Sequence, residues 1–344
     1  MKQLTIAVPS YNSAEFLHIG LESYTYEDWS MDPRLEVIII NDGSTDSTLE
    51  VANSWAEKYP DNIKVIDKEN GGHGSGINAG MDNASGRYIK VIDSDDWIIT
   101  ENLRPVLDAL EKTNADIVTT KFHTVNIASG VTLAYEMGDV SEPTEVSMAD
   151  FVKHKEQYLC AQMFHGLMYN TQFLKDTGLR MSEKIFFEDQ EYAILPFMYG
   201  KTVLLLPYFF YEYQIGSQNQ SVTFENQGKR ESHLRAVLEK MINCHKRAVL
   251  SAAQEEFVSW RISNVAVSYY ATVLVKGKDK KGGREKAAAF RYYLQKNEPD
   301  IFGACEGKYK MMCRLNRVPG ATALYGRLFN SKLYRSFKKR WVKN

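Results

Sequence analysis

A cluster of aspartates near residue 90 has the residue types and spacing most suited to chemistry. A short run rich in apolar residues, Tyr88–Ile92, leads directly into Asp93, Ser94, Asp95 and Asp96. Carboxylates a few ångströms apart repel one another strongly in a low dielectric, and a divalent cation relieves that repulsion. Oxygen ligands suit Mg²⁺ or Mn²⁺, which often bind substrate phosphates as well. The cluster therefore predicts a metal site, with a solvated turn that caps the next helix as the alternative.

Three more polar clusters follow short apolar runs earlier in the chain. They are Pro9-Ser10-Tyr11-Asn12, Asn41-Asp42-Gly43-Ser44 and the glycine-rich stretch Asn70–Gly76. In a doubly wound sheet, ligands bind beyond the carboxyl ends of the strands, so we expect all four clusters to line one crevice. The glycine-rich stretch lacks the final spacing of the dinucleotide fingerprint G-x-G-x-x-G, which disfavours a hydride-transfer enzyme.

The elements that must position these clusters alternate along the first 120 residues. Runs rich in Val and Ile predict strands over residues 4–8, 35–40, 63–66, 87–93 and 115–120, and helical patterns fill 48–59 and about 100–113. This order predicts an α/β fold with a mostly parallel central sheet. Residues 121–160 suggest loops and edge strands, the aromatic run Tyr208–Tyr211 is typical of a core strand, and residues 228–298 are typical of helices interrupted by a loop at Lys276–Gly283.

Composition and charge limit the classes of protein that the chain can belong to. Its 344 residues, 44% of them hydrophobic, suffice for one α/β core plus a smaller region, which excludes disordered and fibrous classes. The four cysteines, Cys160, Cys244, Cys305 and Cys313, match no metal-ligand spacing and indicate reduced thiols in a cytoplasmic protein. The apolar start Leu4–Val8 is too short for a secretion signal, and no run approaches the roughly 20 residues that cross a bilayer.

As an ordered set, five motifs resemble those of the inverting family 2 glycosyltransferases, which have the GT-A fold. The motifs are VPSYN at 8–12, INDGSTDST at 40–48, ENGGHGSGINAG at 69–80, GRYIKVIDSDDW at 86–97 and FEDQEY at 187–192. The resemblance covers about residues 1–220, and the order of the motifs is far more specific than any one of them. It implies a Rossmann-like nucleotide-sugar-binding domain and metal-assisted sugar transfer with inversion, from a uridine rather than a guanosine diphosphate sugar.

The resemblance also implies which residues bind the donor and the metal. Pro9, Ser10 and Tyr11 would contact the base and ribose, and Asp42 would accept a hydrogen bond from the base. Asp93 would face the ribose or sugar and, together with Asp95, the Mn²⁺ or Mg²⁺ ion that bridges the diphosphate. The other residues expected on the donor side are Asn12, Gly71, Gly72, Asn78 and Ser94.

On the acceptor side, an inverting transfer needs a base that removes the proton of the attacking hydroxyl. The resemblance places this base in the Glu188-Asp189 pair, with Asp189 as the base and Glu188 in support, and it places Asp96 and Trp97 near the acceptor. Adjacent carboxylates can raise one another's pKa, which suits a base. Taken alone, the pair fits a solvated helix start better than a catalytic site.

The chain departs from the family pattern at two places. Ile77 stands where many members carry an arginine before the asparagine, and Gln214 lies in a loop where an arginine or histidine often stands. Any contact of those side chains with phosphate is therefore absent or supplied by another residue. His73 is predicted either to touch substrate or to act in capping and packing.

We expect three regions: a GT-A catalytic domain at 1–225, a helical region at 226–300 and a basic amphipathic tail at 301–344. No acidic residue follows Glu306, whereas eleven Lys and Arg residues do. Apolar residues recur every three or four positions between Leu324 and Trp341, so a helix there would have one apolar face bordered by cations. Such a tail fits an anionic membrane surface and docking on the acidic body equally well, and nucleic-acid binding is not expected.

The sequence thus predicts a glycosyltransferase that acts on a glycan or lipid-linked acceptor in cell-surface polysaccharide synthesis. We expect it in the cytoplasm, peripheral at the inner face of the membrane if the tail binds there. One alternative is a sugar-phosphate nucleotidyltransferase, but the residues after the first strand, VPSYNSAEF, lack the glycine-rich, arginine-containing loop of that class. The other is a catalytically silent module that binds carbohydrate or protein. Retention of Asp93, Asp95 and Asp189 disfavours it.

Overall fold

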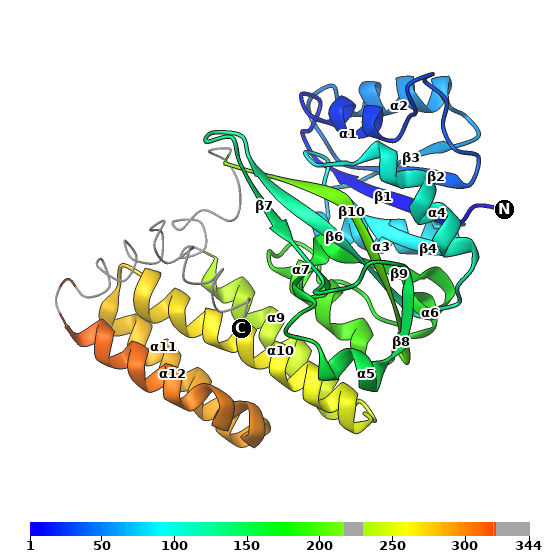
Figure 1. Ribbon diagram of the computed structural model, residues 1–344. Coiled ribbons are helices and arrows are strands. Elements are labelled where there is room, and N and C mark those ends of the chain that lie inside the picture. Colours follow the sequence, from blue (N-terminus) through cyan, green and yellow to red (C-terminus); the bar gives the residue numbers. More distant parts are fainter. Residues whose placement is uncertain (217–229, 319, 321–344) are drawn as a thin grey trace. The chain divides into compact units, whose positions relative to one another are not determined.

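The computed structural model describes residues 1–216, 230–318 and 320. Its contacts divide the chain into two compact units (Figure 1). The first consists of Met1–Ser217 with Leu250–Gln254, and the second of Gln218–Val249 with Glu255–Asn344. The predicted boundary at residue 225 and the amphipathic segment 324–341 lie outside the described residues.

The first unit is built on one twisted sheet. Its strands are β1 (Leu4–Ser10), β2 (Leu35–Asp42), β3 (Ile63–Lys68), β4 (Tyr88–Val91), β5 (Trp97–Ile98), β6 (Ile117–Asn126), β7 (Val131–Tyr135), β8 (Thr144–Ser147), β9 (Leu167–Asn170) and β10 (Thr202–Ile215). Their order is β3-β2-β1-β4-β9-β6-β10-β5, with β7 on β6 and β8 on β10.

Six of these strands run in the same direction, which confirms the predicted mostly parallel sheet. β3, β2, β1 and β4 pair in parallel, and so do β6 and β10. β9 lies antiparallel between β4 and β6, so the two parallel groups point the same way. Every residue of β1 and β2 is buried, as expected for Val- and Ile-rich strands covered on both faces.

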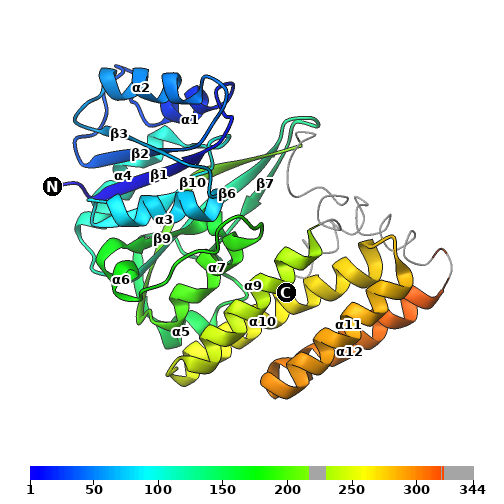
Figure 2. The same ribbon diagram turned by 180° about the vertical axis from the view of Figure 1, so that it is seen from behind.

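The helices of the first unit are short and follow the strands. They are α1 (Leu17–Ser23), α2 (Thr48–Lys58), α3 (His73–Asn83), α4 (Leu103–Glu111), α5 (Met148–Lys153), α6 (Thr171–Asp176) and α7 (Glu188–Ile194). Seen from behind, α3 crosses the face of the sheet over β1 and β2 (Figure 2). The helix predicted at 100–113 is present, but its start is a 3₁₀ turn at Thr100–Asn102.

Glycines let α3 approach the sheet closely. A Cβ at Gly76 would lie 2.7 Å from Pro9 Cβ, and one at Gly80 would lie 2.6 Å from Ala7 Cβ. The stretch Asn70–Gly76 follows the end of β3, and its second half forms the first turn of α3, which begins at His73. The glycines serve helix packing, which overrides their low helix propensity.

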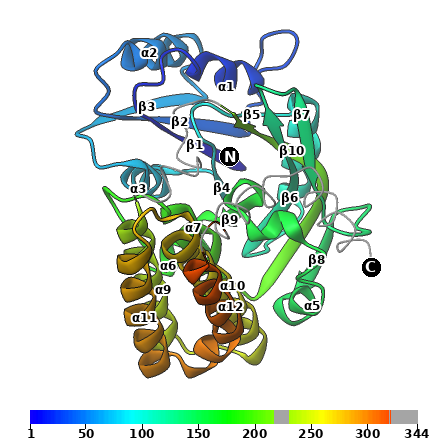
Figure 3. The ribbon, with the colours of Figure 1, turned by 90° about the vertical axis from the view of Figure 1, so that its left-hand side faces the viewer.

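The second unit is helical in its described part, as predicted. It contains α9 (Glu231–Arg247), most of α10 (Ala252–Ala271), a π-helical turn (Thr272–Lys276), α11 (Lys280–Asn297) and α12 (Pro299–Arg317), which run side by side (Figure 3). The loop predicted at Lys276–Gly283 is shorter than expected. The Asp279 side chain accepts a hydrogen bond from Gly282 N–H and starts α11 there. Among the described residues, no helix is long and apolar enough to cross a membrane.

Candidate functional site

The carboxyl ends of β1, β2 and β4 lie at one edge of the sheet, and hydrogen bonds join the residues that follow them. The backbone N–H of Asn12 donates to Ser44 Oγ at 3.0 Å, and Asn12 Oδ1 accepts from the N–H of Thr45 at 2.8 Å. The hydroxyls of Ser13 and Ser94 lie 2.7 Å apart. Residues after β1 therefore contact those after β2 and those after β4.

The glycine-rich stretch joins this edge through the buried carboxylate of Asp42. Its Oδ1 accepts hydrogen bonds from Lys68 Nζ at 2.6 Å and from the N–H of Gly71 at 2.9 Å, and its Oδ2 accepts from the N–H of Gly72 at 2.7 Å. Asp42 thus fixes the start of α3 against the end of β2. A hydrogen bond to a nucleotide base stays a prediction, and Oδ2, which accepts one hydrogen bond, has a further lone pair for it.

His73 bridges two carboxylates that are distant in the sequence. Its Nε2 lies 2.9 Å from Asp93 Oδ1, and its Nδ1 lies 2.7 Å from Glu188 Oε1. Burial opposes a charge on the ring, but the two carboxylates outweigh it and raise the pKa of His73 well above its usual value. Burial likewise opposes ionisation of Asp93, and His73 outweighs it, so the pKa of Asp93 is lowered.

Asp96 is fully buried and is held from β10. Tyr211 donates its hydroxyl hydrogen to Asp96 Oδ2 at 2.6 Å, and the N–H of Gln214 donates to Asp96 Oδ1 at 2.7 Å. Burial raises the pKa of Asp96 well above its usual value, and repulsion from Asp93 and Asp95 adds to this effect. The contact of Gln214 described here is with Asp96, and the phosphate contact of its loop stays open.

The Glu188-Asp189 pair lies at the start of α7. Phe187, directly before it, has φ of +74°, a left-handed conformation that costs of order 1–3 kcal/mol in a residue other than glycine. Burial raises the pKa of Asp189 to about 6, and the neighbouring Glu188 carboxylate contributes. A carboxylate with a pKa near neutrality suits a general base.

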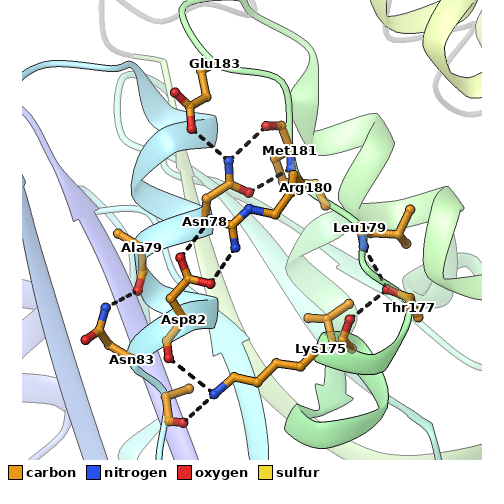
Figure 4. A network of polar contacts seen from close by, with 12 residues as sticks. Asn78, Ala79, Asp82, Asn83, Lys175, Thr177, Leu179, Arg180, Met181 and Glu183 are labelled. Carbon is orange, nitrogen blue, oxygen red and sulfur yellow. Dashed lines mark hydrogen bonds and ion pairs between the residues drawn. The ribbon is translucent and has the colours of Figure 1, made fainter.

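The segment before α7 is tied to α3 through Asn78 (Figure 4). Asn78 Nδ2 donates to the carbonyl of Met181 at 3.0 Å and to Glu183 Oε1 at 3.1 Å, and its Oδ1 accepts from the N–H of Met181 at 2.8 Å. Arg180 pairs with Asp82 one turn farther along α3, with Nη2 2.7 Å from Oδ2. The described contacts give Asn78 a structural role, and its predicted contact with the donor stays a prediction.

The residues present also suit a divalent cation. Asp93, Asp96 and His165 each offer one ligand atom, and these atoms lie within 4.8 Å of one another. Burial lowers the pKa of His165 to about 4, which keeps its imidazole neutral and able to ligate, and its buried Nδ1 has no hydrogen-bond partner in the described structure. Asp95, half-buried in the same turn, is outside this group, and its predicted role as a ligand stays a prediction.

The other predicted residues lie at the same edge. Tyr11 is 53% exposed, so its ring is available for stacking, while Ser10 is buried and donates its hydroxyl to the carbonyl of Val8. Pro9 lies against Gly76. Trp97 is half-buried in β5 and pairs with Glu212 of β10.

Sequence reasoning missed three residues that hold the site together. Tyr211, within the aromatic run assigned to a core strand, also binds Asp96. His165 lies in a 3₁₀ turn that carries no motif. Lys90 is fully buried and donates to the carbonyls of His165 at 2.6 Å and Leu167 at 3.2 Å, and burial lowers its pKa to about 7. A lysine inside an otherwise apolar strand was the one available signal.

Comparison with known proteins finds similarity to glycosyltransferases. The family model described as glycosyl transferase family 2 matches residues 5–168. Over these residues, just under half of its length, the chain is similar to family 2 glycosyltransferases. GlyA, a glycosyltransferase of Streptococcus pneumoniae, is 30% identical over 137 residues, which are 40% of this chain and 19% of GlyA. The poly(ribitol-phosphate) beta-N-acetylglucosaminyltransferase TarS of Staphylococcus aureus is 24% identical over 207 residues, 60% of this chain and 34% of TarS.

Solved structures place the chain in the GT-A fold. The crystal structure of TarS residues 1–349 has a TM-score of 0.65 at 20% identity and covers 92% of this chain and 90% of that one, and a complex of the same fragment with UDP-GlcNAc has a TM-score of 0.61 at 18% identity. The mannosyltransferase PcManGT of Pyrobaculum calidifontis, in complex with GDP-Man and Mn²⁺, has a TM-score of 0.51 at 16% identity over 96% of this chain and 89% of that one. At these identities the likeness shows the fold.

The raised pKa of Asp189 predicts a gain in stability for Asp189→Asn at high pH. The folded state holds the proton more tightly than the unfolded state, with a pKa of about 6 against 3.8, so Asp189 costs stability as the pH rises from about 4 to 6. Above pH 7 the full cost, up to about 3 kcal/mol, is present.

Urea denaturation in EDTA should find Asp189→Asn more stable than the parent at pH 8 and equal to it near pH 4. Asp176→Asn, exposed in α6, is the control; a gain for Asp189→Asn that is independent of pH contradicts the prediction.

Proposed function

We propose that this chain is an inverting glycosyltransferase that moves a sugar from a nucleoside diphosphate sugar to a glycan or lipid-linked acceptor in surface polysaccharide synthesis. The observation that carries the proposal is that His73 lies between Asp93 and Glu188, with Asp96 beside Asp93 at the carboxyl edge of the sheet. The donor side needs ionised carboxylates, and the acceptor side needs a carboxylate whose raised pKa suits a base. Here the pKa of Asp93 is lowered and that of Asp189 is raised.

The donor is a uridine diphosphate sugar. TarS, which shares the fold along most of this chain, is described in complexes with UDP-GlcNAc and with UDP. In this chain, Tyr11 offers an exposed ring for the base, and Asp42 can accept a hydrogen bond beside it. The backbone amides of Gly71 and Gly72 hold Asp42 in place.

The metal is Mn²⁺ or Mg²⁺, held by Asp93 and Asp95, with Asp96 and His165 close enough to join. When bound, the ion acts as a Lewis acid that stabilises the departing diphosphate. The fold of a Mn²⁺-containing relative and the compact group of Asp93, Asp96 and His165 support this assignment. Tyr211 and the N–H of Gln214 orient Asp96, so a metal or acceptor meets a fixed carboxylate.

Asp189 removes the proton from the acceptor hydroxyl. The hydroxyl oxygen attacks the anomeric carbon, the bond from that carbon to the diphosphate oxygen breaks, and the proton ends on the Asp189 carboxylate. The pKa of about 6 leaves Asp189 ionised at neutral pH yet basic enough to accept the proton. Gln190 Nε2 donates to Asp189 Oδ2 at 3.0 Å and leaves Oδ1 for the acceptor.

Donor titration in a calorimeter tests the metal and the donor together. Wild-type protein should bind UDP-GlcNAc or another UDP-sugar when Mn²⁺ is present and far more weakly in EDTA. Asp95→Ala should remove the metal-dependent part while the melting temperature stays close to that of the parent, because Asp95 lies in a partly exposed turn. Asp139→Ala, an exposed aspartate, is the control. Undiminished donor affinity in Asp95→Ala with Mn²⁺ overturns the metal assignment.

Asp189→Asn separates the base from donor binding. The change keeps the size of the side chain and removes its basicity, so turnover should fall by roughly a hundredfold or more while donor affinity stays near that of the parent. Glu188→Gln should have a smaller effect on turnover. If Asp189→Asn keeps turnover within a few fold of the parent, the base lies elsewhere, and a larger loss in Glu188→Gln would assign it to Glu188.

The amphipathic segment 324–341 of the basic tail, which lies outside the described residues, is part of the proposal on sequence grounds. It would hold a cytoplasmic enzyme at the inner membrane surface, since each Lys or Arg near an anionic surface contributes about 1 kcal/mol. The full chain should sediment with anionic liposomes at low salt and be released at high salt, whereas a chain ending at Pro319 should stay folded and in solution. A full chain that ignores anionic liposomes at low salt, or a shortened chain that unfolds, contradicts membrane binding and favours a tail that docks on the protein.

A further inference from the structure

A cavity of about 1130 Å³ lies on the first unit, between the loop that joins α1 to β2 and the start of α4. The loop contributes Thr25–Pro33, and the 3₁₀ turn with α4 contributes Thr100, Glu101, Arg104 and Pro105. Ligand pockets in proteins have volumes of this order. Of the described residues that line it, none belongs to the donor, metal or base assignments above.

Two aromatic side chains give the cavity flat surfaces. Trp29 is 55% exposed, and Tyr26 is half-buried and donates its hydroxyl to Asp32 Oδ2 at 3.0 Å. Backbone hydrogen bonds close the loop around them, from the N–H of Trp29 to the Tyr26 carbonyl and from the N–H of Tyr26 to the Ser30 carbonyl, both at 2.8 Å. The closed loop fixes the rings in advance, which reduces the ordering that binding would require.

The backbone at Trp29 adds to this picture. Its φ is +60°, a conformation that glycine adopts more readily than any other residue, and the Tyr59 hydroxyl donates to its carbonyl at 2.9 Å. Loop geometry alone would therefore favour glycine at this position. An exposed indole in a strained backbone points to a use for the ring itself.

The polar groups of the cavity suit a ligand rich in hydroxyls. The exposed carboxylates of Glu22, Glu27 and Glu101 make no hydrogen bond or ion pair within the part of the chain that the structure describes. A carboxylate only accepts hydrogen bonds, whereas the Arg104 guanidinium only donates them. Sugar hydroxyls do both, and the C–H face of a sugar ring packs on an aromatic ring.

Charge narrows the class of ligand further. The described lining residues include one guanidinium, Arg104, and five carboxylates: Glu22, Glu27, Asp28, Asp32 and Glu101. Arg34 pairs with Asp32, and the remaining negative charge disfavours a phosphate-bearing polymer.

Cations of the chain already lie over both aromatic rings. Arg104 Cζ lies 5.1 Å from the ring centroid of Tyr26, and Lys58 Nζ lies 4.8 Å from that of Trp29. A basic ligand would have to compete with these two side chains, and an uncharged ligand would not.

We propose that this cavity is a carbohydrate site that binds an uncharged sugar chain. Trp29 and Tyr26 provide the surfaces on which sugar rings stack. The carboxylates of Glu27 and Glu101 accept hydrogen bonds from the sugar hydroxyls.

The place of the cavity in the fold indicates that the bound chain is a remote part of the acceptor, and this step rests on the proposed function. α1 contacts both places, because Glu22 in its last turn lines the cavity and a Cβ at Gly20 would lie 2.7 Å from the carbonyl oxygen of Asp96. Trp97, expected on the acceptor side, lies three residues before Thr100 of the cavity. A chain held at a second point has a higher effective concentration at the first.

Binding is tested with four uncharged tetrasaccharides: the β-1,4-linked tetramers of glucose, mannose and N-acetylglucosamine and the α-1,4-linked tetramer of glucose. In wild-type protein labelled with ¹⁵N-tryptophan, at least one of them at millimolar concentration should shift the indole N–H signal of Trp29. That signal is assigned by its loss in Trp29→Gly, which suits the φ of +60° and should fold. None of the four shifting it overturns the proposal.

Affinities for the sugar that binds are then compared by saturation-transfer NMR. Trp29→Gly should weaken binding at least tenfold, because the stacking surface is lost. Tyr292→Ala, which removes a 68% exposed aromatic ring from α11, is the control and should stay within twofold of wild type. Equal affinity of Trp29→Gly and wild type overturns the proposal.

Glu27→Gln combined with Glu101→Gln distinguishes an uncharged ligand from a charged one. Glutamine still accepts hydrogen bonds, so tetrasaccharide affinity should fall less than threefold. A peptide of alternating Lys and Gly and poly(ribitol phosphate) are the charged probes. A larger shift of the Trp29 signal with either charged probe than with any tetrasaccharide overturns the assignment to uncharged sugar, and so does a tenfold loss of tetrasaccharide affinity in the double variant.

The link to the acceptor is measured separately, with a UDP-sugar that the protein transfers. The tetrasaccharide that binds at Trp29 should have a KM at least fivefold below that of its monosaccharide, and Trp29→Gly should remove the difference. Equal KM values, or a bound tetrasaccharide that is no acceptor, overturn this link. If wild type binds and transfers no UDP-sugar, the proposed function fails, and the NMR titrations still decide the cavity. If it transfers sugar while no tetrasaccharide shifts Trp29, the inference fails alone.

Discussion

Repulsion among carboxylates is the constraint around which this site is built. Asp93 and Asp96 follow β4, and Glu188 and Asp189 lie almost a hundred residues later. Asp96 and Glu188 are buried and the other two are half-buried, where water screens their repulsion less than in bulk. The surrounding elements supply groups that stabilise these carboxylates. His73 comes from α3, and the hydroxyl of Tyr211 and the N–H of Gln214 come from β10. β10, which pairs with β6, thus supplies both of these hydrogen bonds to the Asp96 carboxylate.

Close packing of α3 is what delivers His73 to that position. Gly76 and Gly80 let the helix lie against β1, and Gly74 does the same toward the segment before α7, since a Cβ there would lie 2.0 Å from the carbonyl oxygen of Ser182. The Asn78 amide then binds both backbone groups of Met181. The glycines of α3 do not have the spacing of a dinucleotide-binding loop. Their role in this structure is to let α3 lie close to β1 and to the segment before α7.

The predictable parts of the molecule are those encoded locally. Strands such as Leu35–Asp42 are continuous apolar runs, and the acidic turn after β4 stands out by charge alone, so the sheet and Asp93–Asp96 follow from the sequence. β9 does not, because an antiparallel strand of four residues between two parallel ones depends on neighbours supplied by the fold. His165 could not be predicted as a site residue for the same reason. Its turn has no motif, and it reaches Asp93 and Asp96 only through the topology of the sheet.

The buried Lys90 explains how that turn is held without a motif. It lies in β4, three residues before Asp93, and donates to the carbonyls of His165 and Leu167. The turn at Phe164–Gly166 precedes β9, so these bonds link it to the strand that leads into Asp93. A buried polar group is retained only where its bonds offset desolvation, and here two carbonyls and the ring of Tyr211, 5.1 Å from Nζ, surround the amine. The strand that presents the carboxylate therefore also positions the imidazole that could share a metal with it.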